Sequence, residues 1–141
     1  MSFNELSNTI SHLKAKGEMN FISRATEEQI TAFEINTGFA LPSKYKEWLL
    51  FSDGGELFLP AGIQLYGVAH KPLIDVNDND RPNVNYIIIG ALASGDPILC
   101  EKDEERISIF NHEAGKIESD ESYTDFVDFL NNLDEVLRIG S

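Results

Sequence analysis

The stretch GFALPSKYKEWLLFSDGG, residues 38–55, decides the fold of this chain. Pro42 disfavours helical backbone at the residue before it, so the Leu41-Pro42 pair predicts a bend between two helices. The second of these helices begins at Pro42 or Ser43, and Asp53-Gly54-Gly55 ends it because glycine readily adopts left-handed backbone conformations. We expect its tryptophan, the only one in the chain, to lie in the core rather than to form a platform for a ligand. Its apolar side comprises Tyr45, Trp48, Leu49 and the following Phe51.

Two more helices are predicted before this stretch. Thr26 and Gln29 have the spacing of a capping box, which marks a helix start, and Gly38 marks the end of the same helix. Its apolar side is predicted to comprise Ile30, Phe33 and Ile35. The earlier helix, over residues 3–16, is indicated by apolar residues that recur every three or four positions and share one face: Phe3, Leu6, Ile10 and Leu13.

Beyond residue 55 the apolar residues no longer follow a helical period. Short runs broken by proline and glycine predict strands joined by turns between residues 57 and 66. Three further strands are predicted over residues 86–89, 97–101 and 106–110. Consecutive strands with short connections favour an antiparallel sheet.

A helix is predicted to close the domain. Ser122 and Asp125 resemble a capping box, and the apolar face that follows comprises Tyr123, Phe126, Val127, Leu130, Leu133, Val136 and Leu137. The chain is therefore predicted to be a single α+β domain over residues 1–141, with a core at about residues 20–137. Its mainly antiparallel or mixed sheet would be packed by the N-terminal helices and the C-terminal helix.

The chain is strongly acidic, with 24 acidic and 11 basic side chains and a net charge of −13. Residues 71–141 hold 16 acidic against 6 basic side chains, whereas residues 1–70 hold 8 against 5. A nucleic-acid or anionic-membrane partner is disfavoured, because both surfaces attract clustered lysine and arginine. The charge instead favours a basic partner, whose association it would accelerate, although acidity also serves solubility alone.

The sequence favours a cytoplasmic location. No stretch approaches the about 20 apolar residues that a membrane helix needs. The N-terminal segment lacks the basic and apolar regions of a signal peptide. Cys100 is the only cysteine, so no internal disulfide can form, which is typical of a reducing compartment.

One segment, Asp75-Val-Asn77-Asp78-Asn79-Asp80, matches the first half of a calcium loop. The match then fails, because Asp80 stands where the loop needs glycine and Tyr86 where it needs a bidentate glutamate. A solvated loop is the better interpretation, and a weak cation site is the alternative. The chain offers no set of ligands for zinc, because it has one cysteine and three widely spaced histidines. We therefore expect no metal and no cofactor.

No motif for covalent catalysis is complete. Ser94 lacks the first glycine of a G-x-S-x-G nucleophile elbow. Cys100 lies in an apolar strand, where a buried thiol is usually inert. The glycine-rich loops that hold phosphates are also missing, so we expect no enzymatic activity and no catalytic residues.

Short pieces of the chain occur in an order that points to a family. The first half carries Thr26-Glu-Glu-Gln-Ile30, Gly38-Phe-Ala-Leu-Pro42, Tyr45-Lys-Glu-Trp48-Leu-Leu50 and Asp53-Gly54-Gly55. The second half adds Ile88-Ile-Gly90, Gly95-Asp96-Pro97-Ile98, Ile107-Ser-Ile-Phe110, His112-Glu113 and the helix with Phe126, Phe129 and Leu130. Over about residues 20–135 these pieces resemble the SUKH superfamily, which includes the yeast cell-wall-assembly regulators of the SMI/KNR type. Asp53 stands where the family has asparagine, and both side chains suit the turn.

The resemblance implies an α+β fold without established catalytic residues. It also implies a function, because small bacterial members are immunity proteins that bind and neutralise toxins, commonly nucleases. The alternatives are an intracellular regulatory or scaffold module that binds another protein, as in the fungal regulators, and a weak ligand-binding domain. The positions that match the family and are interpreted as structural are Leu41, Pro42, Trp48, Gly54, Gly55 and Gly95.

An immunity function would explain the negative charge, because an acidic protein can bind and cover the basic site of a toxin. The partner would then be a basic toxin domain. The acids predicted to contact it lie beside turns: Asp78, Asp80, Asp103, Glu104 and Glu105. The alternative is that these side chains are solvated loop charges.

Overall fold

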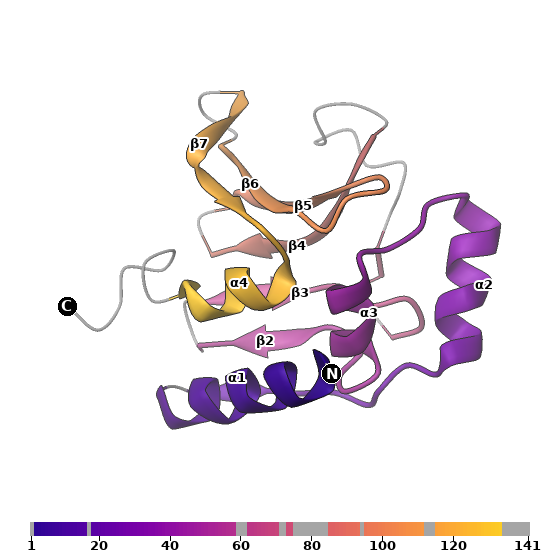
Figure 1. Cartoon of the computed structure of the whole chain (residues 1–141), viewed down its shortest axis with the longest axis horizontal. Coiled ribbons are helices and arrows are strands. Elements are labelled where there is room, and N and C mark those ends of the chain that lie inside the picture. The colour runs from indigo at the N-terminus through magenta and orange to yellow at the C-terminus, as the bar shows by residue number, and fades with distance from the viewer. Residues whose placement is uncertain are drawn as a thin grey trace.

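Strands that follow one another along the chain pair side by side in one antiparallel sheet (Figure 1). The structure is a computed structural model that describes residues 2–16, 18–58, 62–70, 73–74, 85–93, 95–111 and 115–133. Within these residues the sheet has seven strands in the order β1-β2-β3-β4-β5-β6-β7. The predicted antiparallel meander and α+β class are confirmed. The strands are β1 Met19–Asn20, β2 Gly55–Leu57, β3 Ile63–Leu65, β4 Tyr86–Leu92, β5 Pro97–Glu101, β6 Ile107–Asn111 and β7 Lys116–Tyr123.

Helices pack over the end of the sheet formed by the first strands. Helices α1, α3 and α4 contact one another there, whereas α2 stands at the side (Figure 1). The predicted apolar face of α1 is confirmed at Leu6, Ile10 and Leu13, which are all buried, whereas the side chain of Phe3 lies outside the described part of the chain. The helices described are α1 Ser2–Lys16, α2 Glu27–Thr37, α3 Ser43–Leu49 and α4 Phe126–Asn131.

Local signals fix both ends of α2. Thr26 Oγ1 accepts from the Gln29 amide at 3.1 Å, and Gln29 Oε1 accepts from the Thr26 amide at 2.9 Å, which confirms the capping box. Gly38 ends the helix in the left-handed conformation, with φ of 70°. The expected place of Ile35 on the apolar side is wrong, because its side chain is 75% exposed. Ile35 follows the buried Ile30 by five positions, which turns it about 140° around the helix axis.

The bend before α3 is held by a side chain of α2. Leu41 is buried, and its amide donates to Glu34 Oε2 at 2.7 Å. The same carboxylate oxygen lies 3.5 Å from Lys46 Nζ. Pro42 has extended backbone, with φ of −57° and ψ of 141°. The bend predicted at Leu41-Pro42 is therefore confirmed, and one carboxylate ties both of its sides together.

Trp48 lies at the centre of the core, as predicted. It is completely buried, as is Tyr45 on the same helix. Its indole packs edge-to-face on Phe126 of α4, with ring centroids 5.7 Å apart. Its Nε1 donates to the carbonyl oxygen of Gly54 at 3.0 Å, so the buried polar atom of the ring is satisfied.

The region before α4 differs from the prediction. Residues Lys116–Tyr123 form strand β7, which the sequence did not reveal because this acidic segment has few β-forming residues. Ser122 therefore lies in a strand, and its Oγ is 3.2 Å from that of Ser108. The cap of α4 is Asp125, whose Oδ1 accepts from the Asp128 amide at 2.8 Å. The end of the predicted helix, residues 134–137, lies outside the described residues.

Candidate binding site

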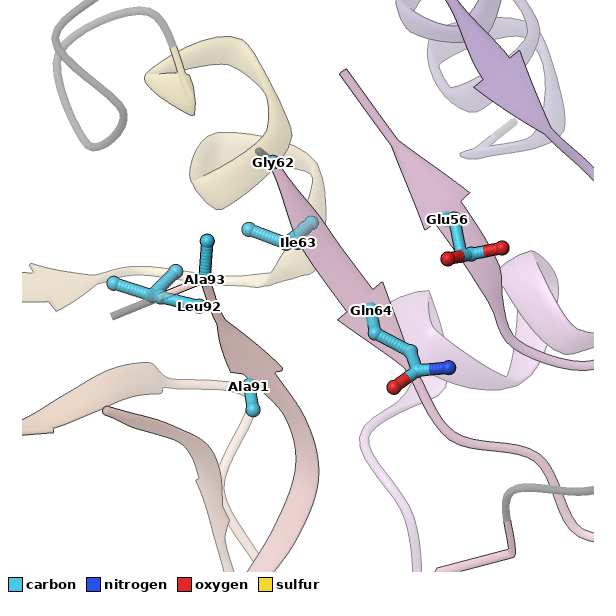
Figure 2. A pocket seen from close by; sticks show the side chains of 7 residues that line it. All are labelled: Glu56, Gly62, Ile63, Gln64, Ala91, Leu92 and Ala93. Carbon is cyan, nitrogen blue, oxygen red and sulfur yellow. The ribbon is translucent and has the colours of Figure 1, made fainter. Parts of the chain in front are cut away.

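A pocket of about 170 Å³ opens where β2, β3 and β4 lie side by side (Figure 2). It contains one ionisable side chain, Glu56, and one side-chain amide, Gln64, among aliphatic residues. The volume is below the about 300 Å³ of an ordinary small-molecule site. The residues that line it are Glu56, Gly62, Ile63, Gln64, Ala91, Leu92 and Ala93.

Sheet register places the polar side of this pocket. Glu56 is the Cα partner of Gln64, and Gln64 is the partner of Ala91. Partners in register point to the same face of a sheet. Their neighbours along the strands are buried in the core, so this row faces away from it. Figure 2 shows Glu56 and Gln64 on neighbouring strands, with their polar ends on the same side.

Small residues leave the space that forms the pocket. Ala91 and Ala93 have short side chains, and Gly62 has none. Gly62 must stay a glycine, because a Cβ built on it would lie 1.8 Å from the carbonyl oxygen of Leu57. Its own carbonyl oxygen accepts from the Ala93 amide at 3.0 Å, which joins β3 to the end of β4. The pocket wall is therefore rigid backbone on this side.

The carboxylate of Asp53 forms a second polar centre. Asp53 is completely buried, and its Oδ1 accepts from the Val68 amide at 2.7 Å. Its Oδ2 accepts from the amides of Ala69 and His70 at 2.8 and 2.7 Å. The same oxygen lies 2.8 Å from His70 Nδ1, which carries the proton because a carboxylate only accepts. Both carboxylate oxygens of Asp53 are therefore used as acceptors, and that asparagine would also suit this turn stays a prediction.

The connection between β5 and β6 carries three of the predicted partner-binding acids. Asp103 and Glu104 are exposed, and Asp103 has a φ of 65°. Glu105 has a structural task, because its Oε2 accepts from the Ser43 amide at 2.9 Å. Its Oε1 accepts from Ser43 Oγ at 2.9 Å and from the Lys44 amide at 3.3 Å. Glu105 therefore caps α3, which has no side-chain cap of its own.

The two remaining predicted acids belong to a segment that the structure does not describe. Asp78 and Asp80, together with the whole Asp75–Asp80 segment, lie outside the described residues. His112 lies outside them as well. Contact between a partner and Asp78, Asp80, Asp103, Glu104 or Glu105 stays a prediction.

A comparison with protein families identifies the family of this chain. The sequence model of the SMI1/KNR4 family (SUKH-1) matches residues 24–132, which include the pocket, the Asp53 centre and the Glu105 cap. The chain belongs to the SMI1/KNR4 family. A comparison with curated proteins gave no match. Membership supports a protein-binding domain of immunity or regulatory type, in a family that is generally non-enzymatic.

The glycines that were predicted to be structural have backbone conformations that favour glycine. Gly54 and Gly55 have φ of 105° and 118°, values that favour glycine. Gly95, in the turn between β4 and β5, has φ of 97°. The carbonyl oxygen of Gly54 accepts from Trp48 Nε1, so the glycine turn and the core tryptophan form one unit.

Reactive groups in the described part of the domain are buried or scattered. Burial raises the pKa of the Cys100 thiol far above its ordinary value, so the thiol stays protonated and unreactive. Burial also raises the pKa of Tyr45. Among the described residues, no three His, Cys, Asp or Glu side chains gather as metal ligands. None of the helices described is long and apolar enough to cross a membrane.

The pairing of Glu56 with Gln64 was not predicted from the sequence. Each is the polar residue between two buried ones in a three-residue strand, Gly55-Glu56-Leu57 and Ile63-Gln64-Leu65. Alternation of this kind could have indicated that both face outward. Only the register places them next to each other and next to Ala91.

Proposed function

We propose that this protein is a non-enzymatic immunity protein that binds and neutralises a basic toxin domain in the cytoplasm. The observation that carries the proposal is the match to the SMI1/KNR4 family over residues 24–132. The net charge of −13 adds the chemistry of the partner. A nuclease is a suitable toxin, because a protein that binds phosphates presents a basic surface.

Charge would act mainly on the rate of association. An acidic surface attracts a basic partner and accelerates their association, and dissolved salt screens this attraction. The exposed acids Asp103 and Glu104 are suited to this role, because neither is engaged in an ion pair within the described part of the chain. Glu105 contributes indirectly by holding the connection against α3.

Co-expression with the toxin domain encoded by the neighbouring gene tests the proposal. The wild-type chain should restore growth and should co-purify with the toxin as a stable complex. Growth without a complex, or a complex without protection, would instead support the regulatory or scaffold function of the family. Absence of both would refute an immunity function towards that toxin.

Charge variants test the acidic connection. Asp103→Asn with Glu104→Lys changes the charge by three units and leaves Glu105 and the cap of α3 intact. We expect slower association at low salt and a weaker dependence of the association rate on salt. The matched control is Glu27→Lys with Glu28→Gln, which makes the same change at exposed positions of α2. Equal effects of both variants would mean that only the net charge matters.

A further inference from the structure

The pocket contains acceptor groups that the domain itself does not use. Glu56 Oε1 accepts from Asn20 Nδ2 at 3.2 Å. Within the described part of the chain, Glu56 Oε2 has no hydrogen-bond partner and the Gln64 side-chain amide makes no hydrogen bond. Cross-strand neighbours have Cβ atoms about 5 Å apart. A carboxylate oxygen and an amide oxygen can therefore be presented together at the pocket.

We propose that this pocket receives the guanidinium group of one arginine of the basic protein partner, an inference that rests on the proposed function. Guanidinium is planar and has five N–H donors in a fixed fork. Two of its donors can reach oxygens on neighbouring strands, one from Glu56 and one from Gln64. The carbon stem of the arginine packs against Ala91, which is the register partner of Gln64 and lies on the same face of the sheet.

Charge and size select this occupant over others. An anion is repelled by Glu56 and by the net charge of −13. An apolar group would cover the Glu56 carboxylate without giving it a partner, which is unfavourable. A volume of about 170 Å³ accommodates one long side chain rather than a nucleotide or a cofactor. Lysine supplies a single point of charge and cannot bridge both oxygens in one plane.

Peptide titration observed by NMR on the full chain tests the inference. The probe is N-acetyl-Gly-Arg-Gly-amide, and the neutral isostere is the same peptide with citrulline. We expect saturable shifts at the amides of residues 62–64 and 91–93 and at the Gln64 side-chain amide. The citrulline peptide should produce none of them, and the matching lysine peptide should bind at least threefold more weakly. Shifts spread over the acidic surface, or equal shifts with citrulline, would overturn the inference.

Two charge-matched variants separate the pocket from the overall field. Glu56→Gln keeps an oxygen for Asn20 and should weaken binding of the arginine peptide at least tenfold. Glu104→Gln removes the same charge from the exposed connection between β5 and β6 and should change binding less than twofold. Equal losses in both variants would show a field effect and would refute a specific pocket.

The toxin complex separates this inference from the proposed function. If the wild-type chain protects and Glu56→Gln protects with unchanged affinity, the proposed function stands and the arginine pocket is refuted. If Glu56→Gln accelerates dissociation while Glu104→Gln does not, both are supported. If the wild-type chain does not bind the toxin at all, the proposed function is refuted for that toxin, and the peptide titration alone decides whether the pocket binds arginine.

Discussion

Asp53 and His70 are joined by a hydrogen bond between Oδ2 and Nδ1, 2.8 Å long, in which the carboxylate is completely buried and the imidazole is 41% exposed. The same carboxylate accepts the amides of Val68, Ala69 and His70. Asp53 lies in the turn between α3, which ends at Leu49, and β2, so these bonds attach the segment after β3 to the turn that follows the helix. A residue that the sequence marks as a helix terminator is thus also a long-range anchor.

Asp53→Asn should destabilise the domain by about 2–3 kcal/mol, because hydrogen bonds to a charged acceptor contribute about 1.5–3 kcal/mol. The asparagine amide would direct N–H donors at backbone amides that need an acceptor. His70→Ala, the control, removes only the half-exposed ring and should lower the free energy of unfolding by about 1 kcal/mol. Urea unfolding measures both. Equal stability of Asp53→Asn and the wild type would contradict the role given to the carboxylate.

Glu105→Ala should destabilise the domain by about 1 kcal/mol, the usual effect of losing a helix N-cap. The reason is that Glu105 supplies the cap that Pro42 cannot give to α3. Glu104→Ala removes the adjacent exposed acid and should change the free energy of unfolding by less than about 0.5 kcal/mol. Thermal unfolding of the two variants distinguishes them. A larger loss for Glu104→Ala than for Glu105→Ala would be inconsistent with the cap.

Features that depend on neighbours in the sequence could be predicted. The capping box of Thr26 and Gln29, the left-handed Gly38 and the bend at Pro42 each involve a few consecutive residues. The burial of Trp48 followed from its place on an amphipathic helix. Local chemistry fixes such features because the groups that satisfy one another are already close in the chain.

Features that depend on contacts between distant parts of the sequence could not be predicted. Glu105 reaches Ser43 across 62 positions, and Asp53 reaches the amide of His70 across 17. Within the described part of the chain, strand β7 pairs with β6 alone, at an edge where an acidic sequence is tolerated and the usual apolar alternation is not needed. The pocket arises from the register of Glu56, Gln64 and Ala91. None of these relationships has a local sequence signal.

Ile35→Ser should leave stability within about 0.5 kcal/mol of the wild type, because the side chain is 75% exposed. Ile30→Ala on the same helix should lower the free energy of unfolding by about 2–4 kcal/mol, since Ile30 is buried in the core. Urea unfolding of both variants measures the contrast. A marked loss of stability in Ile35→Ser would mean that Ile35 is covered in solution.

Alkaline pH should destabilise the domain through Cys100. Burial raises the pKa of this thiol in the folded chain, whereas an unfolded cysteine ionises near pH 8.5. The unfolded state therefore loses the proton first. The contribution of the thiol is complete below about pH 8.5 and is lost as pH rises, by up to about 1.4 kcal/mol per pH unit.

Cys100→Ala isolates this effect, because it removes the ionisable group. Between pH 8.5 and 10 the free energy of unfolding of the wild type should fall more steeply than that of the variant, as urea unfolding at a series of pH values would record. Above about pH 10 both should fall, because burial also raises the pKa of Tyr45 in the folded state and the unfolded tyrosine then ionises first. Parallel curves between pH 8.5 and 10 would contradict a buried, protonated thiol.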